Sequence, residues 1–453
     1  MIESETEESK SKAASELRAE RRMPHVVWEE LDFAHAKPLR TATLAADGSK
    51  FHLLRERGSH PRRFWASLTS AFLPEGYPDS VTSDYLGFQF WDTLQGLSTY
   101  IRSMLSTNTL LSGIGVGKTS ATVIGATFQW FLRDFTGMLG GVIFTIYQGS
   151  NLDCKAKQWR LAADFMNDIG MLMDLISPLF PRLFITILCL GSLARSVTGV
   201  ASGATRAALT QHFALQQNAA DISAKEGSQE TAATLMGMLV GMLLAEVTSG
   251  HVGVIWLCFL ALTGFHMFAN YKAVRCLHLT SLNKDRTKIV LQAYLETEKV
   301  LTPSDVSSRE VLLPWFSTMK QSSSHHERVV MGAKISMIDT GGWKRLPQIV
   351  QRYAKGTYMI YPHEGRIFVI LHRCATREDH LKSYIHALVA ASLLGSFDAD
   401  EVESNSCVWM ENNFSVFLSE LNASGWNVNR IHMVPERWRA EWHLSAIMDL
   451  KSD

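Results

Sequence analysis

The chain has 453 residues, 46% of them apolar, and its 44 basic and 44 acidic residues give a formal net charge of zero. This length and apolar content favour two or three folded domains and exclude a wholly disordered chain. With no net positive charge and no block of like charge, nucleic-acid binding is not expected. The six cysteines lie far apart without C-x-x-C spacing, which argues against a disulfide scaffold or a zinc module.

The N-terminal part divides into a leader and a small segment. Residues 1–24 carry both charge signs but no apolar run, which predicts a disordered leader without a clear secretory signal or transit peptide. Residues 25–80 form a small N-terminal segment, β-rich or irregular up to about residue 60. Proline and glycine in LPEGYPDSV precede a helix predicted over residues 81–105, with Asp84 and Asp92 on one face.

Charged residues are depleted in the middle of the chain. Only 18 of the 169 residues in 103–271 are Asp, Glu, Lys or Arg, against 40 of the 171 residues in 283–453. Residues 247–271 contain none, and they exceed the roughly 20 residues that cross a bilayer. The predicted fold class is therefore mainly α, with a polytopic helical membrane bundle over 81–282 and a small cytosolic α+β domain over 283–453.

About six membrane spans are predicted, at about 110–132, 134–150, 160–180, 182–208, 229–248 and 250–271. The third carries three aspartates and must be buried inside the bundle. Four small-residue pairs predict close helix contacts: Gly113/Gly117, Gly137/Gly141, Gly199/Gly203 and Gly237/Gly241. Cytoplasmic loops collect Lys and Arg, and placing both chain ends inside puts seven basic loop residues inside and two outside. A multi-pass protein with an even number of crossings is expected.

The C-terminal domain has an ordinary α+β pattern. GTYMIYPHEGRIFVILHRC predicts a hairpin that turns at His363, Glu364 and Gly365. Two helices are predicted to follow, over 377–394 and 413–422, and then a strand near 428–433.

No motif predicts catalysis, a cofactor or a metal. SGIGVGKTS, residues 112–120, lacks the first glycine of a phosphate-binding loop, and no strand precedes it. The paired histidines are interpreted as surface or core residues: His325, His326, His380 and His386. We therefore expect the protein not to be an enzyme.

Two segments resemble motifs of major facilitator transporters. The first lies between the second and third predicted spans and contains Gly149, Asp153, Lys157 and Arg160. The second, in the fourth span, contains Arg195, Gly199 and Gly203. A complete transporter of this kind has twelve helices, so the resemblance implies half of one.

At a closer level the chain resembles the root UV-B sensitive family. The stretches that carry the resemblance are LPEGYPDSVTSDYLGFQFWDTLQ, GATFQWFLRDFTGMLGG, residues 155–181 and NAADISAKEGSQET. They cover about residues 60–280 and do not extend to the C-terminal domain. The family is known mainly from plants. The resemblance implies membrane association and roles in vitamin B6 homeostasis, UV-B responses and auxin transport, but no agreed reaction.

Two functions fit this pattern. The first is a carrier or transporter-like component, because charges inside a membrane are costly and tend to mark pathways. Its candidate pathway residues are Asp84, Asp92, Arg133, Asp134, Asp168 and Arg195. The second is a membrane-tethered scaffold whose loop over 211–230 and C-terminal domain recruit soluble proteins; the charges would then form structural pairs.

Arg195 requires an acidic partner under either function, since an unpaired guanidinium in a membrane is costly. Asp134, Asp164 and Asp168 are the candidates. The binding partners expected are membrane lipid, a second copy or a related family member, and a small ligand such as a B6 vitamer.

Overall fold

The computed structural model describes residues 25–32, 37–44, 51–55, 68–114, 123–312, 328–338, 346–434 and 436–442. The chain forms two compact units, one of residues up to Ser83 with 213–231, the other of 84–212 with 232 onwards. Several predicted features lie outside the described residues, namely the leader 1–24, Gly117, the loop around Lys118, and His325 with His326.

The first unit contains an antiparallel sheet in the order β1-β2-β3, formed by His25–Asp32, Lys37–Leu44 and Phe51–Arg55. The expectation of a β-rich segment is confirmed. Residues 68–83 are fixed to the first turns of α7 (Ala219–Val247). The Glu75 N–H donates to Asp221 Oδ2 at 2.8 Å, and Gln229 Nε2 donates to the Phe72 carbonyl at 2.6 Å.

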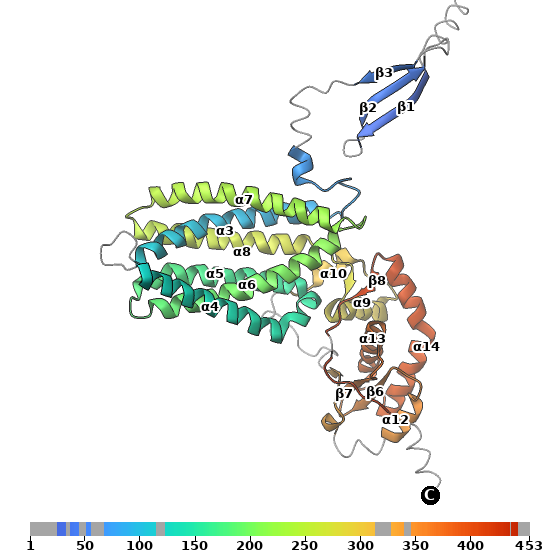
Figure 1. Ribbon diagram of the computed structural model, residues 1–453. Helices are drawn as coiled ribbons and strands as arrows, with labels where there is room; N and C mark the ends of the chain where they lie inside the picture. The colour runs from blue at the N-terminus through green and yellow to red at the C-terminus, as the bar shows by residue number, and fades with distance from the viewer. Residues whose placement is uncertain are drawn as a thin grey trace, which may run out of the picture. The chain divides into compact units, whose positions relative to one another are not determined.

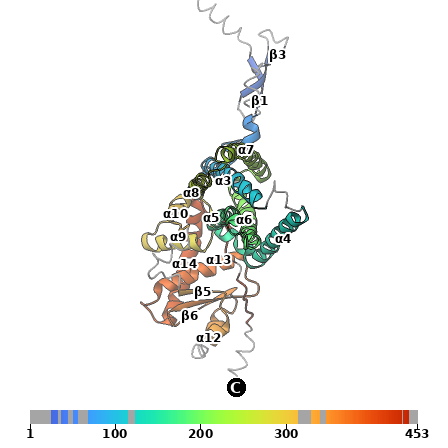
Figure 2. The ribbon, with the colours of Figure 1, turned by 90° about the vertical axis from the view of Figure 1, so that its left-hand side faces the viewer.

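The second unit contains a bundle of long helices, which Figure 1 shows running side by side and Figure 2 shows close to end-on. Besides α7, these are α3 (Tyr85–Ile114), α4 (Val123–Gln148), α5 (Ala156–Ile176), α6 (Phe184–Phe213) and α8 (Val252–Cys276). Short 3-10 turns at Gly149–Asn151 (η1) and Asp153–Lys155 (η2) connect α4 to α5, and Ser177–Leu179 (η3) follows α5.

Some predicted helix boundaries are wrong. The helix predicted over 81–105 runs from Tyr85 to Ile114, and the two helices predicted on either side of Arg133 are one continuous helix, α4. The charge of Arg133 suggested a loop between the two helices, but arginine is compatible with a helix interior. The Arg133 guanidinium lies over the Trp130 ring, 4.6 Å from its centroid, which keeps it on the helix surface.

The predicted loop over 211–230 is also wrong, because α7 begins at Ala219. Its sequence AADISAKEGSQET is polar but rich in good helix formers. Lys225 and Asp221 form an i, i+4 ion pair of 3.5 Å on this turn. A polar composition was therefore mistaken for irregular structure.

Two of the predicted glycine contacts are confirmed. A Cβ on Gly237 would lie 2.7 Å from Tyr100 Cβ, and one on Gly241 would lie 2.8 Å from Met104 Cβ, so α7 packs closely on α3. Gly137 and Gly141 face α6 in the same way. The Gly117 partner of Gly113 lies outside the described residues.

The predicted contact at Gly199 and Gly203 is wrong, because an added Cβ would meet no atom within 4 Å among the described residues. The close contacts of α6 are made elsewhere, with α4 at Gly137 and with α5 at Gly170. A Cβ on Gly170 would lie 3.0 Å from the Gly191 carbonyl oxygen. Small-residue spacing shows that one face of a helix has no large side chains. It does not show whether a neighbouring helix packs on that face.

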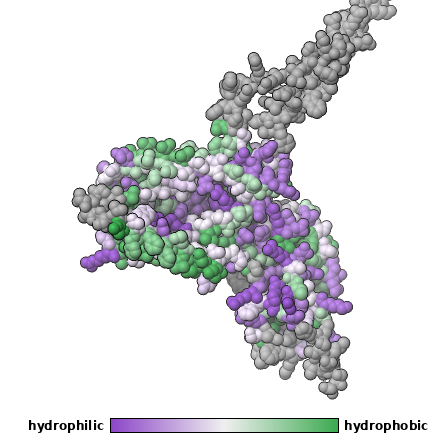
Figure 3. Space-filling view, viewed as in Figure 1, coloured by the Kyte–Doolittle hydropathy of each residue, from purple (hydrophilic) through white to green (hydrophobic). Residues whose placement is uncertain are grey.

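The outer faces of the bundle are apolar. Ile124 on α4, Leu243 on α7 and Leu257 on α8 are 83%, 68% and 70% exposed, and Figure 3 shows hydrophobic residues gathered over α4 and α7. Exposed apolar surface that extends over several helices is rare on proteins surrounded by water. Among the described residues, α6, α7 and α8 are long and apolar enough to cross a membrane.

The C-terminal part is an α+β module with two small sheets, in the orders β4-β8 and β5-β7-β6. Its strands are Ser281–Leu282 (β4), Val329–Met331 (β5), Tyr358–His363 (β6), Arg366–Leu371 (β7) and Asn427–Ile431 (β8). Its helices are Lys284–Thr297 (α9), Pro303–Arg309 (α10), Leu346–Arg352 (α12), Arg377–Leu393 (α13) and Ala399–Ala423 (α14), with a 3-10 turn at Ile335–Met337 (η5). Helix α13, the predicted hairpin and the last strand are confirmed.

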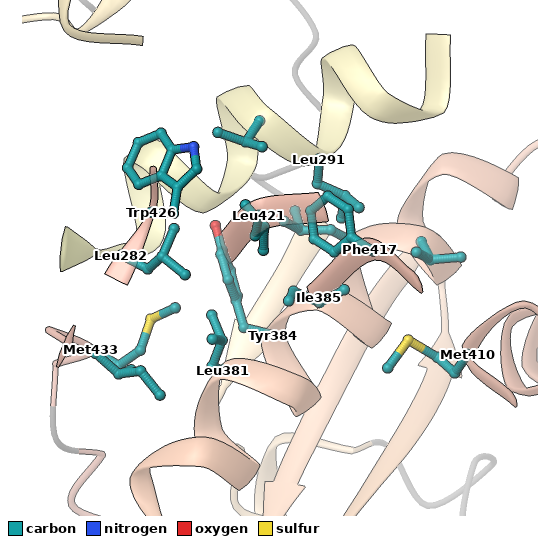
Figure 4. Close-up of a cluster of buried hydrophobic side chains, with 14 of the residues drawn as sticks. Leu282, Leu291, Leu381, Tyr384, Ile385, Met410, Phe417, Leu421, Trp426 and Met433 are labelled. Atoms are coloured by element: carbon teal, nitrogen blue, oxygen red, sulfur yellow. The ribbon is translucent and has the colours of Figure 1, made fainter. Parts of the chain in front are cut away.

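The second predicted helix of this module is much too short. Helix α14 begins at a capping box in which Asp398 and Glu401 exchange backbone contacts, so its first half is helical despite its many polar residues. Figure 4 shows Phe417 and Leu421 of α14 in one cluster with Leu291 of α9 and Tyr384 of α13. Burial of these side chains holds the module together.

Candidate functional site

A buried polar network joins α3, α5 and α8 inside the bundle. Arg102 Nη1 donates to Asp168 Oδ1 at 2.6 Å, and His266 Nδ1 lies 3.0 Å from Asp168 Oδ2. Gln95 Nε2 lies 2.7 Å from His266 Nε2. Arg102 and His266 are completely buried. The carboxylate of Asp168 therefore connects a guanidinium on one helix with an imidazole on another.

A neutral histidine is sufficient for these contacts. If Nδ1 of His266 carries the proton, it donates to Asp168, and Nε2 can then accept from the Gln95 amide. Arg102 Nη1 also donates to Thr263 Oγ1 at 3.1 Å, and Ser98 Oγ donates to the Leu262 carbonyl at 2.9 Å. These bonds fix α3 against α8 and orient the network.

A second pair lies along the same helices. Arg160 Nη2 donates to Asp92 Oδ1 at 2.5 Å, and Arg160 Nε lies 3.9 Å from Asp164 Oδ2. Helical spacing explains the alignment on α5, since Arg160, Asp164 and Asp168 are four residues apart.

The network carries more negative than positive charge and has unused polar atoms. It contains three carboxylates, of Asp92, Asp164 and Asp168, but only two guanidiniums. Among the described residues, Arg102 Nη2, Asp164 Oδ2 and both amide atoms of the buried Asn270 have no hydrogen-bond partner. Buried polar atoms normally have partners. A bound water, a proton or a polar solute would satisfy them.

The prediction that Arg195 pairs with Asp134, Asp164 or Asp168 is wrong. Its Nη1 donates to Asp174 Oδ2 at 2.6 Å and its Nη2 to Asp174 Oδ1 at 3.3 Å. Asp174 is six residues beyond Asp168, so at about 100° per residue it faces a different neighbour. The close approach of α5 to α6 at Gly170 also brings the side chains of Asp174 and Arg195 close enough to form this ion pair.

The other candidate pathway residues do not join the network. Asp134 is on the exposed face of α4. Asp84 is buried just before α3, where its Oδ2 accepts from the His278 N–H at 2.7 Å and lies 2.9 Å from His212 Nε2. Asp84 therefore joins α3 to the ends of α6 and α8. Of the six candidates, Asp92 and Asp168 lie in the network.

The loop motif before α5 forms a contact with the C-terminal module. Gly149 and Asp153 lie in the two 3-10 turns, while Lys157 is already in α5. Lys157 Nζ donates to Ser307 Oγ at 2.9 Å and to Glu310 Oε2. Arg286 Nε donates to the other oxygen, Oε1, of Glu310 at 2.6 Å.

This contact changes the acidity of Glu310. Burial raises the pKa of the Glu310 carboxyl, but the charges of Arg286 and Lys157 outweigh burial, so that its pKa is below the usual value. The module is thus tied to the start of α5 by a buried carboxylate.

Sequence reasoning missed Arg102, His266, Asp174 and Glu310. Arg102 lies near the end of the helix predicted over 81–105, and His266 is not counted among charged residues. The signal available was that a charged residue within a long apolar helix needs a buried partner. No group of three or more His, Cys, Asp and Glu residues in the described part of the chain could hold a metal, and all six cysteines are free.

Comparison with known proteins identifies the family. Residues 58–298 match the family described as "Vitamin B6 photo-protection and homoeostasis domain", and residues 299–442 match "Root UVB sensitive protein, C-terminal". The C-terminal module therefore belongs to the resemblance, contrary to expectation. No solved structure matches the chain.

The curated relatives agree. The chain is 54% identical to protein root UVB sensitive 3 of Arabidopsis thaliana, over 90% of this chain and 94% of that protein. It is 46% identical to RUS family member 1 of Dictyostelium discoideum, over 55% and 48%, and 28% identical to protein root UVB sensitive 2, chloroplastic, of Arabidopsis thaliana, over 82% and 84%. The chain therefore belongs to the root UVB sensitive family and contains its vitamin B6 photo-protection and homoeostasis domain.

Proposed function

We propose that the protein is a multi-pass membrane carrier, or part of one, that moves a small polar solute in vitamin B6 homeostasis. The observation that carries this proposal is the network of Arg102, Asp168 and His266 inside an apolar-faced bundle. Keeping a charge in a bilayer costs at least about 2.5–3.5 kcal/mol on insertion scales. Networks of charged side chains inside membrane proteins are commonly found along ion and proton pathways.

The excess carboxylate suggests how the network would work. Three carboxylates and two guanidiniums leave one negative charge, which one bound proton would neutralise. Gain and loss of that proton would change the hydrogen bonds of Asp168 and so the contacts of α3 with α8. Carriage coupled to protons follows from this scheme. As half of a facilitator-like bundle, the chain would act as a pair of copies.

The test is uptake by liposomes that contain the purified full chain. Pyridoxine, pyridoxal and auxin are offered with and without a pH gradient. We expect uptake of at least one B6 vitamer that depends on the gradient and is lost in Asp168→Asn protein that is shown to be folded and inserted. The matched control is Asp134→Asn, which makes the same chemical change on the exposed face of α4.

Two results would contradict the proposal. One is no uptake of any solute by protein that is shown to be folded and inserted. The other is equal uptake by wild type and Asp168→Asn. In either case the network would be a structural staple, and the alternative of a membrane-tethered scaffold would be favoured.

A further inference from the structure

A cavity of about 410 Å³ lies between the start of α5, the first turns of α9 and the chain after α10. This volume is in the range of small-ligand sites, about 300–1,000 Å³. The described residues that line it include five bases and two acids: Lys155, Lys157, Arg286, Lys288, Arg309, Asp285 and Glu310. Its lining therefore has an excess of three positive charges.

The buried part of this charge is fixed in place. Glu310 already shares its two oxygens between Lys157 and Arg286, which holds both bases at the cavity wall. An ammonium has three protons, and Lys157 Nζ donates two of them, to Ser307 and Glu310. One donor of a buried ammonium therefore remains for a ligand.

The outer part is more open. Lys155 and Arg309 are exposed, and among the described residues Lys155 forms no ion pair. The first turn of α9, which begins after the N-cap Asn283, also lines the cavity. The N-terminus of a helix of this length adds partial positive charge and free N–H donors.

The rest of the lining is formed by the polar Gln158, Asn283 and Gln292 and by an apolar part, Ile289, Val311 and Leu312. Inorganic phosphate alone would leave this surface uncovered, whereas an ester with an organic group would cover it. We propose that this cavity binds the phosphate monoester group of an organic ligand, either a soluble phosphate ester or the headgroup of a lipid such as phosphatidic acid. The inference is independent of carriage through the bundle.

Both sources are accessible on physical grounds. The cavity is formed at the start of α5 and by the chain that follows α8, where the apolar helices give way to the polar module. Lipid phosphates lie at this level of a bilayer. A soluble ester would enter from water past Lys155 and Arg309.

The experiment measures binding to the full chain in phosphatidylcholine nanodiscs. Glycerol 3-phosphate and inorganic phosphate are titrated calorimetrically, and a second set of nanodiscs contains phosphatidic acid. Lipid retained by the detergent-purified protein is compared for phosphatidic acid and phosphatidylcholine. We expect saturable binding of glycerol 3-phosphate, selective retention of phosphatidic acid, or both.

The variants identify the site. Lys155→Gln/Arg309→Gln removes two exposed cations without touching the Glu310 contact, and it should weaken binding about tenfold or more, because each is a charge-assisted donor. Lys299→Gln/Arg373→Gln makes the same change at exposed positions outside the cavity lining and should leave binding unchanged.

The outcomes separate the two sources. If phosphatidic acid displaces glycerol 3-phosphate, the lipid reaches the cavity. If phosphatidic acid does not affect the binding of glycerol 3-phosphate, the ligand is a soluble ester. The proposal is overturned if neither compound binds, or if both double variants weaken binding equally. Loss of transport in liposomes with intact phosphate binding would remove the proposed carriage and leave this site standing.

Discussion

Replacing Asp168 by Asn should strongly destabilise the bundle. The carboxylate accepts from Arg102 at 2.6 Å and from His266 at 3.0 Å, and the Arg102 side chain is 0% exposed. Asparagine keeps the shape but leaves this buried guanidinium without the carboxylate to which it is hydrogen-bonded. Breaking a buried pair in this way costs about 3–5 kcal/mol. We expect a loss of unfolding free energy of that size.

The double variant Arg102→Gln/Asp168→Asn should recover much of this loss. The guanidinium and the carboxylate that it contacts are removed together, the two amides can bond to each other, and the Asn oxygen can still accept from His266. A deficit of about 1–2 kcal/mol is expected, comparable to one or two ordinary hydrogen bonds.

The assay is denaturant titration of the full chain in mixed micelles, followed by fluorescence of bundle tryptophans such as Trp91. If Asp168→Asn is within about 1 kcal/mol of wild type, Arg102 is solvated and the dry network described above is refuted. If the double variant is no more stable than the single variant, the two side chains are not coupled.

Four further predictions follow from the sequence and the fold. The protein should remain in the membrane pellet after alkaline carbonate extraction, because three of its helices are long and apolar enough to insert; full-length protein in the soluble fraction would contradict this. Tags at the two ends should be equally accessible to protease on sealed vesicles, as an even number of crossings requires; unequal protection would mean an odd number. Arg195→Lys keeps the charge but loses the bidentate hydrogen bond to Asp174. The variant should accumulate in the membrane yet fail to complement a null mutant. Full complementation would show that Arg195 has only a structural role. The C-terminal module should lose stability as the pH falls below about 6.5, since burial lowers the pKa of His386 to about 3 and that of His380 to about 4. Below that pH the unfolded chain binds protons that the folded chain does not, which costs about 1.4 kcal/mol of stability per pH unit for each histidine. Thermal unfolding at pH 7 and pH 5 measures this loss, and His386→Gln should make it smaller.

Pattern and local chemistry were sufficient for much of the fold. The hairpin of β6 and β7 was recognisable because its alternating apolar residues are interrupted by a turn, and Glu364 and Gly365 adopt the positive φ angles, 48° and 70°, that such a turn uses. The start of α13 was recognisable from Thr376 and Asp379, which form a capping box. The burial of α5 followed from its three aspartates, all of which are buried.

Local pattern failed where polar residues continue a helix. The beginnings of α7 and α14 are polar but helix-forming. The first was predicted as a loop and the second was left out of the predicted helix, because composition alone does not distinguish an exposed helix from a loop. The charge of Arg133 predicts a break in α4 that the structure does not contain, for the same reason. These errors concern a few turns of helix each.

The sequence by itself determined that the chain has an apolar helical region, that charged residues inside it need partners, and that an α+β module follows. It could do so because apolar periodicity, turn residues and caps act over a few neighbouring residues. Which charges meet was decided only by the tertiary structure. Asp168 lies with Arg102 and His266, and Arg195 with Asp174, because helix rotation and the close packing of small residues bring together side chains that are from 21 to 98 positions apart. No local pattern records the rotation of one helix against another.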